Sequence, residues 1–152
     1  MKKLLWLCAA ALTVALTACR TVDSGERGFR EVTDRERRRM LQTSRRLGDG
    51  ILEAFQKKDF DSLLRNTPGD LGERMTEKDF KTSLGEFEKK FGELRDFRLL
   101  TSLDTPAFGN LIWLVTFVRS GTNGAEIRRQ LLFRLVTMQT DGKTQVVSFG
   151  FL

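Results

Sequence analysis

The spacing of the apolar residues changes at Gly92, and this change limits the class of fold more than any other feature of the chain. Before Gly92, apolar residues recur at intervals of three and four, which is the period of an α-helix. After Gly92, runs of β-branched and aromatic residues alternate with turn signals, as in strands. The order predicts an α+β fold with N-terminal helices packed on a bent antiparallel sheet of about four strands.

Capping residues predict where the helices begin. Thr33 with Glu36 fits a capping box for a helix over about 33–57, and Asp59 and Thr76 fit N-caps of two further helices. The third helix carries an apolar stripe that we expect to face the core, formed by Phe80, Leu84, Phe87 and Phe91.

Turn chemistry predicts the register of the last two strands. The strands are expected at 94–103, 110–118, 127–139 and 146–152. Asp141-Gly142 favours a two-residue type I′ turn, which would place Arg134 opposite Phe149 on one face of the sheet. In this register both faces are mainly apolar, so we expect helices to cover one face and a second copy of the chain, as a homodimer, to cover the other.

The first nineteen residues have the layout of an export signal. Lys2 and Lys3 precede an apolar run over 4–16, which is shorter than the roughly twenty residues that span a bilayer. The segment Leu16-Thr17-Ala18-Cys19 resembles the lipobox of bacterial lipoproteins. The resemblance implies a signal peptide over 1–18, a lipid on Cys19, a tether over 19–32 and a single domain over 33–152.

The same resemblance implies a location. A lipid-anchored chain would face the periplasm from the cell envelope, and Arg20 stands where aspartate usually signals retention in the inner membrane of Gram-negative cells. We therefore expect the outer membrane in a Gram-negative host. Cys8 lies in the part that would be removed, so a mature chain with a lipidated Cys19 would have no free thiol.

Composition excludes several chemistries. The chain has no histidine and no tyrosine, which excludes histidine-based triads and histidine zinc sites. It has no glycine-rich phosphate loop, and we expect no metal, no cofactor and no catalytic residue of these kinds. Without Lys2 and Lys3 the net charge of +6 falls to +4, which does not call for a nucleic-acid partner.

The arrangement as a whole resembles the NTF2-like (cystatin-like) superfamily of cone-shaped folds. The segments that carry the resemblance are ILEAFQKKDFDSLL at 51–64, TEKDFKTSLGEFEKKFGEL at 76–94 and LLFRLVTMQTDGKTQVVSFGF at 131–151. The resemblance implies a strongly bent sheet that wraps the helices and leaves a cavity, and dimers formed through the outer sheet face. Enzymes of that superfamily often use tyrosine, histidine and aspartate in the cone, and this chain lacks the first two.

Three functions follow as hypotheses. The first is a non-catalytic binding or interaction module that takes a small apolar or anionic ligand, with Arg134, Trp113 and Phe149 as candidate ligand-binding residues. The second is an enzyme that uses Asp104 or Asp96 with Arg134, and the third is a structural component of an envelope assembly. An inward Arg134 would need an anionic partner, whereas an outward Arg134 would be unremarkable.

Arginines gather on one side of the first predicted helix. Arg35, Arg38, Arg39 and Arg46 fall opposite its apolar stripe. A solvated helix face accounts for them, and attraction to anionic lipid near the anchor is the alternative.

Overall fold

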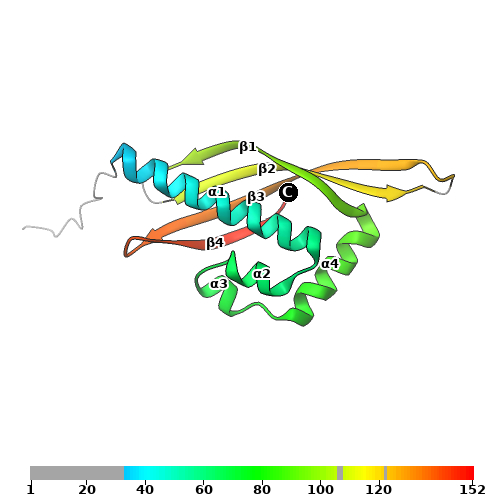
Figure 1. The fold of residues 1–152 in the computed structure, drawn as a ribbon, viewed down its shortest axis with the longest axis horizontal. Coiled ribbons are helices and arrows are strands. Elements are labelled where there is room, and N and C mark those ends of the chain that lie inside the picture. The colour runs from blue at the N-terminus through cyan, green and yellow to red at the C-terminus, as the bar shows by residue number, and fades with distance from the viewer. Residues whose placement is uncertain (1–32, 106–107, 122) are drawn as a thin grey trace, which may run out of the picture. The chain divides into compact units, whose positions relative to one another are not determined.

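Four helices precede four strands in the computed structural model, which describes residues 33–105, 108–121 and 123–152 (Figure 1). The helices are α1 (Asp34–Lys57), α2 (Phe60–Arg65), α3 (Asp70–Glu73) and α4 (Glu77–Phe91). The strands are β1 (Glu93–Asp104), β2 (Phe108–Ser120), β3 (Glu126–Thr140) and β4 (Lys143–Phe151). The predicted signal peptide over 1–18, the lipidation site Cys19 and the tether over 19–32 lie outside the described residues.

The helices begin where the capping signals predict. Thr33 caps α1 in a complete capping box with Glu36, and the Thr76 side chain accepts a hydrogen bond from the backbone N–H of Asp79 at the start of α4. The single turn α3 is an element that the sequence did not predict. None of the helices in the described part of the chain is long and apolar enough to cross a membrane.

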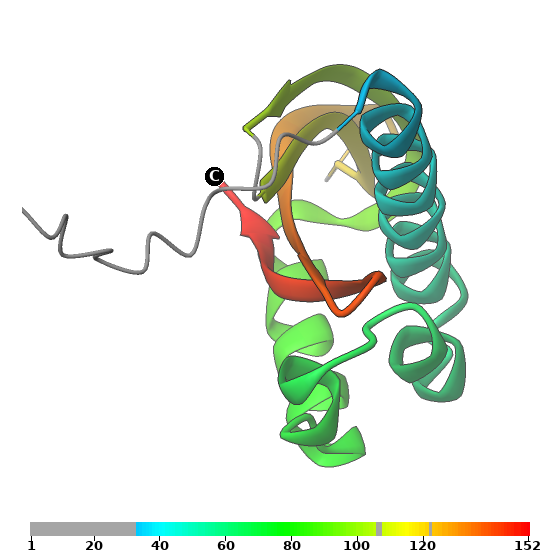
Figure 2. The ribbon, with the colours of Figure 1, turned by 90° about the vertical axis from the view of Figure 1, so that its left-hand side faces the viewer.

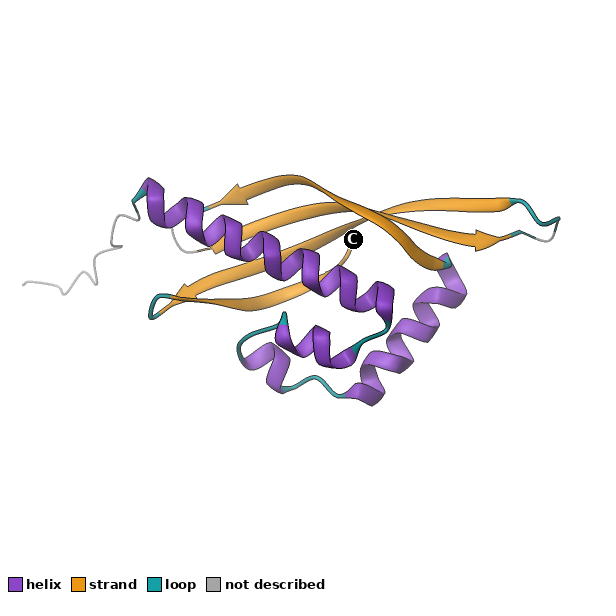
Figure 3. Ribbon diagram, in the orientation of Figure 1, coloured by secondary structure: helices purple, strands orange, loops and turns teal. Residues whose placement is uncertain are grey.

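The strands form one antiparallel meander in the order β1-β2-β3-β4. The sheet curls, and α1 lies along its open, concave side (Figure 2). Helices and strands therefore occupy separate layers (Figure 3), and the predicted α+β class is confirmed. The turn between β3 and β4 is also as predicted, because Asp141 and Gly142 both have positive φ angles, of 51° and 73°.

A bulge in β4 overturns part of the predicted register. The pairing follows the prediction from Thr140↔Lys143 to Thr137↔Val146, and then shifts by one residue so that Val136 pairs with Ser148. The prediction that Phe149 lies opposite Arg134 is wrong, because Phe149 pairs with Leu135. Side chains alternate faces along a strand, so one extra residue moves everything after it to the other face.

A backbone hydrogen bond to the loop between α2 and α3 supports the bulge. The N–H of Val146 donates a hydrogen bond of 2.8 Å to the carbonyl oxygen of Pro68, in the loop between α2 and α3. Val147, the extra residue, is 43% exposed. The shift turns Phe149 and Phe151 toward the helices, where the rings of Phe151 and Phe133 lie 5.3 Å apart.

The core lies between α1 and the concave face of the sheet. Trp113 and Phe133 are fully buried at its centre, with ring centroids 5.9 Å apart. The indole Nε1 of Trp113 donates a hydrogen bond of 2.8 Å to the Asp49 carboxylate on α1. The convex face is less covered, and the large apolar side chains exposed on it or beside it are Leu100, Leu103, Phe108, Leu132, Val147 and Leu152.

Candidate functional site: an apolar pocket between α1, α4 and the sheet

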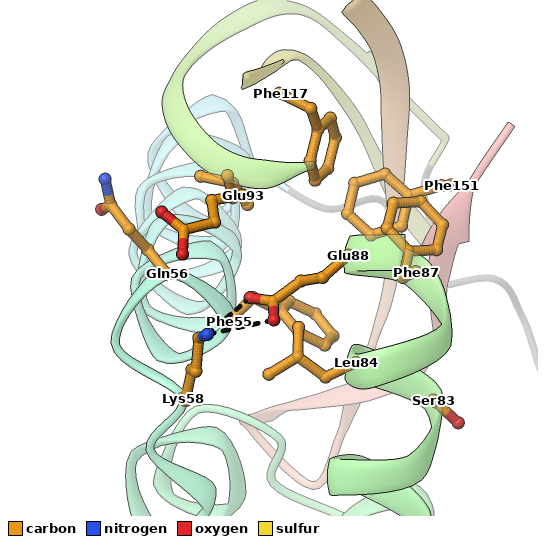
Figure 4. Close-up of a pocket in the computed structure, with 11 residues that line it drawn as sticks. Phe55, Gln56, Lys58, Ser83, Leu84, Phe87, Glu88, Glu93, Phe117 and Phe151 are labelled. Carbon is orange, nitrogen blue, oxygen red and sulfur yellow. Dashed lines mark hydrogen bonds and ion pairs between the residues drawn. The ribbon is translucent and has the colours of Figure 1, made fainter. Parts of the chain in front are cut away.

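An open pocket of about 230 Å³ lies where the C-terminal end of α1 and the C-terminal half of α4 meet the sheet (Figure 4). Its position follows from the fold, because the C-terminal half of α4 leads directly into β1 at this end and faces the end of α1. The pocket is lined by Phe55, Gln56, Lys58, Ser83, Leu84, Phe87, Glu88, Glu93, Leu94, Phe117 and Phe151.

Four phenylalanine rings, from α1, α4, β2 and β4, contribute to the wall of the pocket. Phe87 of α4 stacks on Phe151 with centroids 4.6 Å apart, and it contacts Phe117 of β2 at 5.3 Å. Phe55 of α1 lies 6.1 Å from Phe151. Phe151 reaches this wall only because the bulge in β4 turns it inward, so the pocket depends on the register shift.

An ion pair stands at the mouth of the pocket. The Nζ of Lys58 lies 2.9 Å from Oε1 and 3.0 Å from Oε2 of Glu88, so the two side chains meet between α1 and α4 (Figure 4). The hydrogen bond to Glu88 and the negative charge of Glu88 raise the pKa of Lys58 above its ordinary value.

Backbone geometry aims Lys58 toward Glu88. Lys58 is the C-cap of α1 and adopts the left-handed conformation, with φ 59°. Non-glycine residues adopt this conformation rarely. The N–H of Lys58 donates to two carbonyl oxygens in the last turn of α1, those of Ala54 and Phe55, so the turn that carries the side chain is held in place.

The lining suits binding of an apolar group better than acid–base chemistry. Glu88 is engaged by Lys58, and Glu93 begins β1 at the edge of the site. No cluster of three or more residues that could ligate a metal occurs within the described ranges. The pocket therefore offers an apolar interior and a charged rim.

The structure separates the three candidate ligand-binding residues predicted from the sequence. Trp113 and Phe149 lie on the helix side of the sheet, where Trp113 is fully buried. Arg134 is exposed on the opposite face, and its Nε donates a hydrogen bond of 2.9 Å to Asn110 Oδ1. None of the three lines the pocket. The outward position of Arg134 removes the reason for expecting an anion inside the cone.

Of the two acids considered for an enzyme, Asp96 is not brought together with Arg134 in a pocket of the described residues. Asp96 pairs with Thr116 on the exposed face, whereas Arg134 pairs with Ile112, four residues further along β2. That offset is roughly 13 Å along a strand. Asp104 ends β1, and its side chain is outside the described part of the structure.

The pocket residues were missed by sequence reasoning for two different reasons. Phe55 and Phe87 belong to apolar stripes, so they were expected to be ordinary core residues. Lys58 and Glu88 lie thirty residues apart, and no local pattern joins them. The sequence carries a hint only for Lys58, which follows the last residue of the predicted helix.

Comparisons with known proteins find similar solved structures at low identity. No family model matches the chain, and no curated protein matches it. A SEC-C motif-containing protein from Rhodopseudomonas palustris is 19% identical, with a TM-score of 0.43, and the match covers 66% of this chain and 71% of that one. An NTF-2 like protein of unknown function from Shewanella oneidensis is 13% identical, with a TM-score of 0.44, and the match covers 72% of this chain and 96% of that one. A variant of a protein named Rd1NTF2_05 is 17% identical, with a TM-score of 0.42, and the match covers 76% of this chain and 96% of that one.

Proposed function

We propose that this protein is a lipid-anchored component of the bacterial cell envelope that binds a small apolar ligand without transforming it. The observation that carries the proposal is the pocket between α1, α4 and the sheet, with its apolar wall and its single ion pair at the mouth. Ligand sites in proteins are concave and mostly apolar, with a few polar groups that fix orientation.

The size of the pocket limits the ligand. A cavity of about 150 Å³ holds benzene, and sites for drug-sized molecules begin at about 300 Å³. A pocket of about 230 Å³ therefore suits one or two rings or a short acyl chain. The charged rim at Lys58 and Glu88 would face any polar end of such a ligand.

Filling the pocket should abolish ligand binding. Leu84 lines the pocket from α4, and Leu84→Trp places a larger side chain in it. We expect the Kd of the two-ring dye 6-propionyl-2-(dimethylamino)naphthalene to rise at least about tenfold, which corresponds to about 1.4 kcal/mol. Dye fluorescence is titrated with the unlipidated chain from residue 20 onward.

The matched control makes the same change at an exposed leucine. Leu100 is a 43% exposed residue of β1 that does not line the pocket, so Leu100→Trp adds the same ring away from the pocket. Dye binding should be unchanged in this variant. Equal loss in both variants, or no loss in Leu84→Trp, would contradict binding in the pocket.

The lipid anchor is proposed from the residues around Cys19. The Lys2-Lys3 start, the short apolar run and the small residues before the cysteine support it. Cys19→Ala should release the protein from the membrane pellet after detergent-free lysis and a wash with about 0.5 M salt, because no thiol remains there to receive the lipid and salt screens binding through surface charge. Variant protein that still sediments with the membranes would contradict the anchor.

The exposed apolar side chains of the convex face favour a second role, binding of a second copy of the chain. Leu132, Val147 and Phe108 are 36%, 43% and 42% exposed, and monomers rarely leave large apolar patches uncovered. We expect light scattering of the unlipidated chain at micromolar concentration to give the mass of a dimer. Leu132→Glu should shift this mass to that of a monomer, and a wild-type monomer would exclude the role.

A further inference from the structure

The positive charge of the domain is concentrated in one short segment of α1. Residues 33–46 contain six arginines and two acidic residues, whereas residues 47–152 contain fifteen basic and fifteen acidic residues. Residues 20–32 balance three basic against three acidic residues. The net charge of +4 that follows the predicted signal peptide therefore resides in the first half of α1.

Five of the six arginines share one face of the helix. At 100° per residue they fall in an arc opposite the buried residues Met40 and Ser44. All five are exposed, and with a rise of 1.5 Å per residue they span about 17 Å. This basic face consists of Arg35, Arg38, Arg39, Arg45 and Arg46.

The basic face has little compensation from the rest of the described structure. Arg45 lies 3.6 Å from Asp49, and Arg46 donates a hydrogen bond to the Thr43 hydroxyl. Arg35, Arg38 and Arg39 have no ion-pair partner among the residues that the structure describes. Elsewhere on the helices, charges alternate into i,i+4 pairs such as Lys57 with Glu53 and Lys81 with Glu77.

This arrangement works against helix stability unless an anion is present. Like charges three and four residues apart destabilise a helix, and Arg35, Arg38 and Arg39 stand at these spacings. An external anionic surface would convert the repulsion into attraction. A charged face that is costly alone, with Asp49 as the carboxylate beside Arg45 and no ion pair at Arg35, Arg38 or Arg39 among the described residues, points to such a partner.

The position of α1 leaves the basic face accessible to an external surface. α1 lies on the outside of the helix layer, with its outer face turned away from the sheet (Figure 2). Asp34 follows Cys19 by fifteen residues, and a chain of that length spans at most about 50 Å and on average about 20 Å if flexible. The lipid would thus hold the basic face within reach of headgroups.

We propose that the basic face of α1 binds the phosphate groups of anionic phospholipids and lays the domain on the membrane. The inference takes the membrane from the proposed anchor at Cys19, but the binding chemistry belongs to the arginines alone. Guanidinium groups pair well with phosphates, and each arginine near an anionic surface strengthens attachment. The residues that line the pocket do not belong to the basic face, so membrane binding by the arginines would not involve the pocket.

Proximity of α1 to the bilayer tests the proposal in the lipidated protein. Gln42 lies within the basic face, and Asp141 lies in the β3–β4 turn. A fluorophore on Gln42→Cys or on the control Asp141→Cys is quenched by headgroup-spin-labelled lipid in vesicles. With phosphatidylcholine and phosphatidylglycerol at three to one, we expect at least about threefold stronger quenching at residue 42 than at residue 141. Phosphatidylcholine alone, or about 0.5 M salt, should remove the difference, because salt screens surface charge.

A triple variant, Arg35→Gln with Arg38→Gln and Arg39→Gln, should also remove the difference while the helix stays folded by circular dichroism. Equal quenching at residue 42 with and without phosphatidylglycerol would overturn the proposal and leave the arginines to an acidic protein partner.

A second measurement separates this proposal from the lipid anchor. The intact mass of the purified protein shows whether Cys19 carries lipid. The unlipidated chain is then sedimented with the same anionic vesicles, and the triple variant should partition about 100-fold more weakly than the wild type. An unlipidated wild type that binds anionic vesicles no better than the triple variant would overturn the role of the arginines, whatever the mass of Cys19.

Discussion

Replacing Trp113 with alanine is expected to lower the free energy of unfolding by about 3–5 kcal/mol, the usual cost of emptying a core site of this size. Trp113 is fully buried between α1 and the sheet and lies edge-on to Phe133 at 5.9 Å. Its removal leaves a void that neither layer can close, because both are rigid elements. Urea denaturation followed by circular dichroism measures the change, since the variant lacks the indole that would report by fluorescence.

Volume, rather than the hydrogen bond to Asp49, should dominate this loss. The Asp49 side chain is 35% exposed, so water can replace the indole N–H. Trp113→Phe removes the donor and keeps one ring, and we expect it to cost about 1–2 kcal/mol. A loss below about 1 kcal/mol for Trp113→Ala would show that the site is not a packed core.

Gly48→Ala is expected to destabilise the domain by about 1–3 kcal/mol, although alanine favours helices. A Cβ on Gly48 would lie 2.2 Å from Cη2 and 2.5 Å from Cζ2 of Trp113. The indole is buried and cannot move aside, so overpacking outweighs the helix propensity. Thermal unfolding by circular dichroism measures the difference from the wild type.

Gly85→Ala is the matched control. Gly85 lies inside α4, and a Cβ there meets no atom within 4 Å. The same substitution should stabilise the domain by about 0.5–1 kcal/mol, because only the backbone propensity changes. Trp113→Phe should recover most of the loss in Gly48→Ala, since the smaller ring withdraws from helix α1. Equal signs for the two glycine variants would contradict the close packing of α1 on Trp113.

Local chemistry made the helices and the final hairpin predictable. Thr33, Asp59 and Thr76 cap their helices through side-chain hydrogen bonds within three residues, so a short window of sequence contains the whole signal. Asp141 and Gly142 likewise determine a turn by their own backbone preferences. The class of fold followed from the change of period at Gly92, because helices and strands bury their residues with different spacings.

The pocket and the far end of β4 depend on contacts that no short window contains. The bulge at Val147 is supported by the bond from Val146 to Pro68, across a separation in sequence of nearly eighty residues. The ion pair at the pocket mouth joins the end of α1 to the middle of α4. The partner of Arg134 could not be predicted from its own strand, because Asn110, which accepts its hydrogen bond, lies on β2.

The bulge also determines how this chain must be aligned with a relative whose last strand has no bulge. Up to Val146, the residues of β4 occupy the same positions as those of a strand without a bulge. From Ser148 onward, each residue of β4 is displaced by one position. An alignment without a gap there would equate the inward rings of Phe149 and Phe151 with outward residues of an unbulged relative. Inward and outward positions evolve under different constraints, so similarity scored across the last five residues would be lost unless a single-residue gap is placed at Val147.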